Sequence, residues 1–167
     1  MSEVVAIEFD SPSGEALRVE WPSEALASPG ESRRWRLGGE IDWDEVEALR
    51  VLEADLGDGR TAAVVALRPA GAPGHGDELV AGVLAGGGDV EALDEALLST
   101  EYGPDGLPRR VGLELYRPED PIPIRVAANV ADVSADRDGA LRGVRATLEV
   151  RRSGGTTSGT LEILAPA

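Results

Sequence analysis

The sequence contains no cysteine and no lysine, and its single histidine is His75. Without cysteine, the chain cannot form disulfides, use a thiolate nucleophile or build a cysteine-based zinc or iron–sulfur site. Without lysine, it cannot complete the Gly-Lys-Ser/Thr ending of a P-loop. His75 stands between two glycines, which would not hold an imidazole in place, and no Gly-x-Ser-x-Gly motif supplies a serine nucleophile. We therefore expect His75 at the surface and no catalytic residue, cofactor or metal.

Aromatic residues are also scarce, at 4% of the chain, whereas hydrophobic residues make up 42%. The apolar content is mostly Ala, Val and Leu, and each of these small side chains buries little area. A length of 167 residues fits one domain. We therefore expect a single antiparallel β domain over residues 1–167, with a core stabilised by close sheet packing.

Positive charge is limited to 16 basic residues, all arginine, against 31 acidic residues, which gives a net charge of −15. Such a surface repels phosphate backbones and anionic membranes, so we expect neither nucleic acid nor a membrane as a partner. Either codon bias or adaptation to a salty cytoplasm explains the acidity, and we slightly favour the former. Residues 1–6 lack the features of a signal peptide, and the apolar runs are too short to span a membrane. This predicts a soluble, cytoplasmic protein.

Alternating apolar and polar residues, separated by turn signals, predict a succession of β-strands. Turn residues are clearest at 57–59, 103–106 and 136–139. The alternation changes parity between Val130 and Val133, which predicts a β-bulge. The regular spacing predicts an antiparallel meander, closed as a barrel or packed as a sandwich, with one or two short helices. The expected strands cover residues 4–9, 16–21, 33–37, 49–56, 61–67 and 79–85, both flanks of the 103–106 turn, 122–130, 144–150 and 161–163.

Helical signals occur in three places. Residues 23–26 fit one helical turn. Residues 42–56 show both helical spacing and strand alternation, but the tight turn that follows requires a strand before it, so we predict a strand from about Leu49. Asp89 fits the N-cap of a short helix through residues 90–97.

Three motifs resemble ligand sites, and each has a structural interpretation that we favour. Residues 86–88 are a glycine run of the kind that cradles phosphate, but Glu91 occupies the position of the last glycine in a dinucleotide motif. Acidic residues within 132–138 suggest a calcium loop, but Arg145 falls where a bidentate glutamate is required. The two aspartates in 42–44 have the character of solvated acids. We interpret these segments as a connector, a hairpin turn and surface acids.

Polar residues near the 103–106 hairpin alternate with apolar ones, so several should share one face of the sheet. We favour a solvent-exposed face tied by cross-strand ion pairs, each contributing less than about 1 kcal/mol. The alternative is that this face lines a barrel lumen and orients the polar end of a ligand. The candidate ligand-binding residues are Glu101, Tyr102, Arg110, Glu114, Tyr116 and Arg125.

The hairpin carries a family resemblance. Residues 99–116 read STEYGPDGLPRRVGLELY, and residues 154–163 read GGTTSGTLEI. Both segments resemble parts of uncharacterised bacterial lipocalin-like proteins related to the hydroxyneurosporene synthase and AttH group. The resemblance covers the second half of the chain and carries over no catalytic residue. It implies a lipocalin-like (calycin-like) barrel or sandwich, with hydrophobic ligands as the substrate class.

Three functions remain open on the sequence. The first is a non-catalytic domain that binds a small apolar or amphipathic molecule, or a protein partner. The second is an acid–base enzyme acting on a hydrophobic substrate, in which Glu101, Tyr102, Glu114 and Tyr116 would face a pocket. The third is a structural module that forms a homodimer through exposed strand edges. We favour the first.

Overall fold

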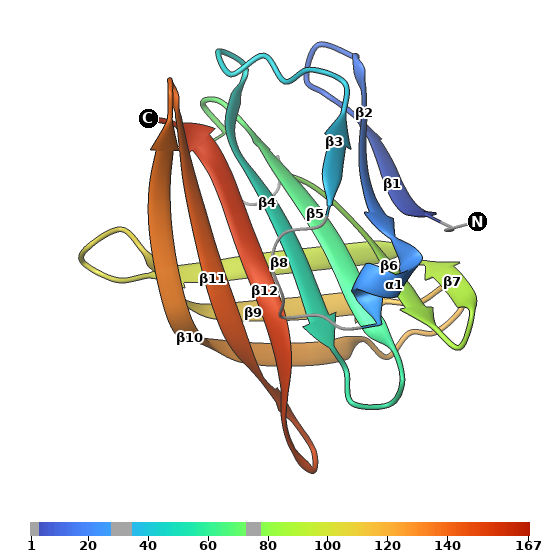
Figure 1. Ribbon diagram of the computed structural model, residues 1–167. Helices are drawn as coiled ribbons and strands as arrows, with labels where there is room; N and C mark the ends of the chain where they lie inside the picture. Colours follow the sequence, from blue (N-terminus) through green and yellow to red (C-terminus); the bar gives the residue numbers. More distant parts are fainter. Residues whose placement is uncertain (1–3, 28–34, 73–77) are drawn as a thin grey trace.

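The computed structural model describes residues 4–27, 35–72 and 78–167, and these form two antiparallel β-sheets (Figure 1). The small sheet has the order β1-β2-β3, with β1 at Val4–Asp10, β2 at Ala16–Pro22 and β3 at Arg36–Gly38. A single turn of helix, α1 (Ser23–Leu26), follows β2 directly. The strands predicted at residues 4–9 and 16–21 and the helical turn predicted at 23–26 are therefore confirmed, and the two strands pair as a hairpin.

The large sheet has nine strands in the order β7-β6-β5-β4-β12-β11-β10-β9-β8, and every neighbouring pair is antiparallel. Its order has two ends, β7 and β8, so the described strands form an open sheet that folds over itself. The strands are β4 (Val46–Asp55), β5 (Thr61–Pro69), β6 (Leu79–Gly86), β7 (Asp89–Ala92), β8 (Glu95–Tyr102), β9 (Pro108–Tyr116), β10 (Ile124–Asp138), β11 (Leu141–Arg152) and β12 (Gly155–Pro166).

The fold-over produces two layers that cross at a steep angle. Figure 1 shows β8 and β9 passing behind β4, β5, β11 and β12. The long strand β10 belongs to both layers, because it pairs with β9 up to Asn129 and with β11 as far as Asp138. Its register shifts between Val130 and Asp132, which confirms the predicted bulge. The bulge provides the bend that carries the strand from one layer to the other.

Two hydrophobic cores lie on opposite faces of β4 and β5. One core fills the space between the two layers of the large sheet, and the other lies between the large sheet and the small one. For this reason β4 is buried on both faces from Leu49 to Ala54, and β5 from Thr61 to Leu67. A strand buried on both faces reads as a continuous apolar run, which explains the composition of β5.

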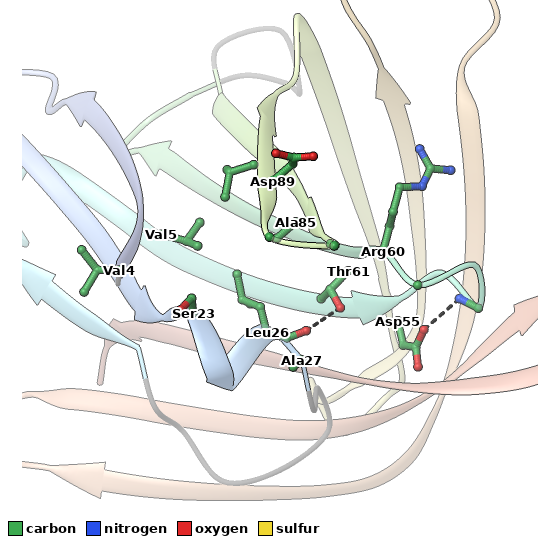
Figure 2. Close-up of a pocket in the computed structure, with 16 residues that line it drawn as sticks. Val4, Val5, Ser23, Leu26, Ala27, Asp55, Arg60, Thr61, Ala85 and Asp89 are labelled. Carbon is green, nitrogen blue, oxygen red and sulfur yellow. Dashed lines mark hydrogen bonds between the residues drawn. The ribbon is translucent and has the colours of Figure 1, made fainter. Parts of the chain in front are cut away.

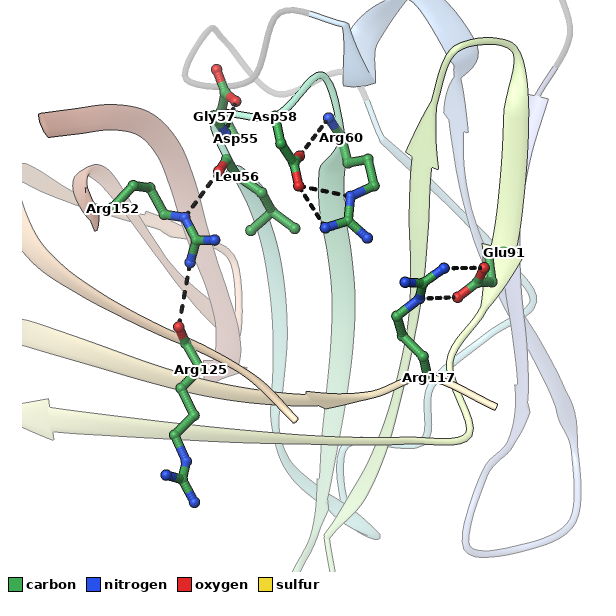
Figure 3. A network of polar contacts seen from close by, with 9 residues as sticks. All are labelled: Asp55, Leu56, Gly57, Asp58, Arg60, Glu91, Arg117, Arg125 and Arg152. Carbon is green, nitrogen blue, oxygen red and sulfur yellow. Dashed lines mark hydrogen bonds and ion pairs between the residues drawn. The ribbon is translucent and has the colours of Figure 1, made fainter. Parts of the chain in front are cut away.

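Arginine side chains tie the two layers together at the end formed by the β4–β5 turn (Figure 3). Arg152 donates from Nε to the Leu56 carbonyl at 2.9 Å and from Nη1 to the Arg125 carbonyl at 3.3 Å. Arg117, just after β9, forms a bidentate pair with Glu91 of β7, with bonds of 2.7 and 3.0 Å. These contacts hold strands from both ends of the sheet near each other at this end of the molecule.

The helix predicted after Asp89 is wrong. Gly87 and Gly88 both have positive φ and form a tight turn, so the chain reverses and Asp89–Ala92 pairs with β6 as β7. The Leu93 amide then bonds the Gly82 carbonyl at 3.0 Å, and β8 begins at Glu95. A short apolar-periodic segment cannot be assigned to helix or strand by spacing alone, and here pairing with β6 decides.

Other boundaries differ by a few residues. The strand predicted from about Leu49 begins at Val46, because the segment pairs with β5 through a bulge at its start. The strand predicted at 33–37 is observed as Arg36–Gly38, while residues 33 and 34, like His75, lie outside the described residues. The turns at 57–59 and 103–106 are confirmed as hairpin connections, whereas the turn predicted at 136–139 lies later, at residues 139–140, because β10 stays paired with β11 as far as Asp138. In the described part of the chain, no helix has the length and apolarity needed to cross a membrane.

Candidate functional site

A pocket of about 480 Å³ lies at the end of the two-layer structure away from the Arg152 contacts. We call it the end pocket. One wall is the inner face of β4, β5, β11 and β12, and the other is formed by β8 and the β8–β9 hairpin. The residues that matter below are Arg50, Arg68, Glu78, Tyr102, Arg142 and Val144.

Strand register explains the apolar floor of the end pocket. Directly paired residues share one face of a sheet, so each register level forms a row across the strands. The deep row is entirely apolar, and the row above it is apolar except for one arginine. The deep row is Val133, Ala146, Leu161, Leu52 and Val64; the next is Ala135, Val144, Ile163, Arg50 and Ala66.

Arg50 is the buried cation of the pocket. Its side chain is 8% exposed and pairs with Glu78, whose side chain is 2% exposed. Arg50 also donates from Nη1 to the Thr100 hydroxyl at 2.7 Å and from Nη2 to the Leu98 carbonyl at 3.3 Å. A buried charge needs a partner and further hydrogen bonds, and Arg50 has both. The hydrogen bonds to Thr100 and Leu98 link β4 to β8 across the gap between the layers.

Arg68 lies at the mouth of the pocket and is also paired. Its Nε is 3.0 Å from Oε2 of Glu47, and its Nη1 is 3.8 Å from Oε2 of Glu78. Its Nη2 donates to the Ala72 carbonyl at 3.0 Å. The two glutamates of the pocket are thus matched by Arg50 and Arg68, and Arg142 remains as an additional cation.

Five of the six predicted ligand-binding residues lie on the outer face of β8, β9 and β10. Glu101 and Arg110 are exposed and border a groove on the outer surface. The next residue along β9, Val111, is buried in the core between the layers. Glu114 lies 3.4 Å from Arg125, measured from Oε1 to Nε. These five residues therefore lie on the outer surface and do not line the end pocket.

Tyr116 belongs to the same outer surface. Its hydroxyl donates to Oε2 of Glu114 at 3.1 Å, and this hydrogen bond is the main reason why the pKa of Tyr116 is raised. Tyr102 is the exception among the six. It has the parity of Ala96, Leu98 and Thr100, which face inward, and it lines the end pocket while remaining 52% exposed.

Arg50, Glu78 and Arg142 were not among the predicted site residues. Two of them carried a signal in the sequence. Arg50 has the parity of the buried residues Leu52 and Ala54, and Arg142 has the parity of Val144. An arginine in register with apolar positions marks the inner face of a strand. Glu78 stands just before β6 and carried no such signal.

A second cavity of about 490 Å³ lies outside the two-layer core, between α1, the start of β1 and the turns at Gly57–Gly59 and 86–88 (Figure 2). Its polar groups are largely used by the fold. The Thr61 hydroxyl donates to the Leu26 carbonyl at 2.5 Å, and Arg60 is held by Asp58. The remaining lining is mostly apolar side chains and glycine backbone, so this cavity offers little to fix a polar ligand.

The polar groups of the end pocket are suited to binding. Arginine and tyrosine side chains over an apolar floor match the general composition of small-molecule sites. Across residues 4–27, 35–72 and 78–167, no cluster of three or more His, Cys, Asp or Glu side chains could hold a metal ion.

No protein-family model matches this chain, and no curated protein sequence is significantly similar to it.

Proposed function

We propose that this protein is a non-catalytic binding domain that holds one small amphipathic molecule in the end pocket. The observation that carries the proposal is the change in polarity along one inner sheet face. The rows formed by β4, β5, β11 and β12 are apolar in the interior apart from the paired Arg50, and they end in Arg68 and Arg142 at the mouth. A molecule with an apolar body and a polar end matches this order.

The size of the pocket supports the proposal. Ligand sites for small organic molecules enclose roughly 300–1,000 Å³, and the end pocket, at about 480 Å³, lies within that range. Burial of apolar ligand surface would contribute about 25 cal/mol per Å² before the costs of association. A lipocalin-like relationship is part of the same proposal, since a curved antiparallel sheet here surrounds a pocket that opens at one end.

The acid–base alternative has less support. It requires Glu101, Tyr102, Glu114 and Tyr116 to face one pocket, but only Tyr102 lines the end pocket. The other three belong to the outer face of β8 and β9. We therefore propose binding as the function.

A neutral fluorescent probe, N-phenyl-1-naphthylamine, tests the proposal, because its emission rises in an apolar environment. We expect saturable binding with one probe per chain. Ala165 lines the end pocket and Ala85 lines the second cavity, and both are half-buried. Ala165→Phe should fill the end pocket and weaken binding at least about tenfold, a loss of about 1.4 kcal/mol. Ala85→Phe is the matched control and should leave the affinity unchanged.

Two results would overturn the proposal. One is the absence of saturable binding to the wild-type protein. The other is loss of binding in Ala85→Phe with normal binding in Ala165→Phe, which would place the probe in the second cavity. Near-ultraviolet circular dichroism of both variants verifies that the tertiary structure is intact.

A further inference from the structure

Two arginines lie directly opposite each other beside the end pocket, and one of them, Arg142, lines it. Arg137 of β10 pairs in register with Arg142 of β11, near the tip of that hairpin. Both belong to the inner face, because Arg137 continues the alternation of Val133 and Ala135, and Arg142 continues that of Val144. They therefore form the outermost row above the apolar floor.

This arrangement is unfavourable for the empty protein. Side chains directly opposite on an antiparallel pair have Cβ atoms about 4.5–5.5 Å apart, and like charges there are destabilising. In the described part of the chain, neither guanidinium has a hydrogen bond or ion pair. The acids that flank Arg137 in sequence, Asp136 and Asp138, alternate to the other face of β10. The protein thus places two unpaired positive charges opposite each other although the chain has a net charge of −15.

The other charges around the mouth do not neutralise this pair. Glu78 is engaged by Arg50 and Arg68, and Glu47 is engaged by Arg68. The positive charge of Arg137 and Arg142 is thus left facing the opening. Arginine forks bind carboxylate, sulfonate and phosphate oxygens through paired, charge-assisted hydrogen bonds.

We infer that Arg137 and Arg142 form the head-group site for an anionic ligand whose apolar body occupies the end pocket. The inference rests on the proposed function and specifies its ligand class: an amphipathic molecule with one acidic group. The acidic group binds between the two guanidinium groups and removes their mutual repulsion. The apolar body extends over Val144 and Ile163 into the space between the layers.

The test compares two probes that differ by one sulfonate group: 1-anilinonaphthalene-8-sulfonate and the neutral N-phenyl-1-naphthylamine. We expect wild-type protein to bind the anionic probe more tightly. The double variant Arg137→Gln/Arg142→Gln should weaken binding of the anionic probe at least about tenfold, the loss expected from one or more charged hydrogen bonds. It should leave the affinity for the neutral probe within about twofold.

A matched control is available on the same strand. Arg151 of β11 is exposed, faces outward and borders the outer groove, so Arg151→Gln should leave both affinities unchanged. If the arginine pair stabilised the fold, the double variant would have a lower melting temperature than the wild type. We expect a melting temperature equal to or higher than that of the wild type, because the substitutions remove the repulsion between the two like charges.

The outcomes separate this inference from the proposed function. If the neutral probe binds in the end pocket but the double variant keeps its affinity for the anionic probe, the head-group site is wrong and the proposed function stands. If Arg151→Gln abolishes anionic binding, the anion binds at the outer groove and the inference is also wrong. If neither probe binds, the proposed function and the inference both fail.

Discussion

Replacing Arg50 with methionine is expected to lower the free energy of unfolding by about 3 kcal/mol. Methionine preserves most of the volume of the side chain but removes its charge and hydrogen bonds. The Arg50 and Glu78 side chains are 8% and 2% exposed, so solvent screens their interaction weakly. Removing one member of a buried ion pair costs about 3–5 kcal/mol. We expect the lower end of that range because Arg68, whose Nη1 lies 3.8 Å from Oε2 of Glu78, still compensates part of the charge of Glu78.

Urea unfolding followed by tryptophan fluorescence measures this change, since Trp21 and Trp35 are 0% and 4% exposed. For a chain of this size, about 3 kcal/mol corresponds to a decrease of about 6–12 °C in melting temperature. Arg125→Met is the matched control. The Arg125 side chain is 75% exposed and its Nε lies 3.4 Å from Oε1 of Glu114, so the expected loss is below about 1 kcal/mol.

A double-mutant cycle tests the cause of the effect. If the loss in Arg50→Met arises from an uncompensated buried carboxylate, adding Glu78→Gln should restore part of it, with a coupling energy of about 1–3 kcal/mol. A free energy of unfolding of Arg50→Met within about 1 kcal/mol of the wild-type value, or additive effects of the two substitutions, would show that the buried ion pair does not have this role.

Three further predictions concern packing, pH and strand edges. A Cβ at Gly159 would lie 2.5 Å from the Glu53 carbonyl oxygen, so Gly159→Ala should destabilise the protein by about 1–3 kcal/mol in urea unfolding. Gly154→Ala, with no atom within 4 Å, should stay within about 0.5 kcal/mol, and equal losses would contradict this. The hydrogen bond from Arg117 lowers the pKa of Glu91 in the folded protein. The contribution of the Glu91–Arg117 pair to stability is therefore present above about pH 4.3, the pKa of an unperturbed Glu, and is lost as the pH falls through the lower pKa of the folded state. The difference in melting temperature between the wild type and Glu91→Gln should therefore shrink in acid, and a pH-independent difference would contradict it. Beyond residue 129 one edge of β10 is unpaired and exposes acidic side chains. Charged side chains protect such an edge from pairing with another chain, so Asp136→Val should increase the mass measured by light scattering. An unchanged mass would show that the charge does not protect this edge.

The local features of the fold could be predicted where a short-range cause exists. The glycines at Gly57, Gly59 and Gly106 adopt positive φ in hairpin connections, and turn chemistry alone predicts such positions. The parity change between Val130 and Val133 likewise predicted the bulge. The segment after Asp89 could not be assigned in this way, because its strand conformation comes from pairing with β6.

The candidate site shows the same division. Alternation correctly placed Glu101, Arg110, Glu114, Tyr116 and Arg125 on one face, but alternation does not say which side of a sheet is covered. The covered side depends on the way β10 bends and brings β8 and β9 over β4 and β5. That bend turns the predicted face outward and encloses the face that carries Arg50.

The antiparallel strand class and most of the hairpin turns can be predicted from the amino-acid sequence, because they follow from side-chain alternation and from backbone preferences within a few residues. Which side chains meet depends on the tertiary structure. Arg50 and Glu78 are 28 residues apart and come together because β5 and β6 pair beside β4. Arg142 faces the same space from β11 because β12 lies between β11 and β4. Strand order and sheet curvature arise from the packing of the whole chain, and no local pattern encodes them.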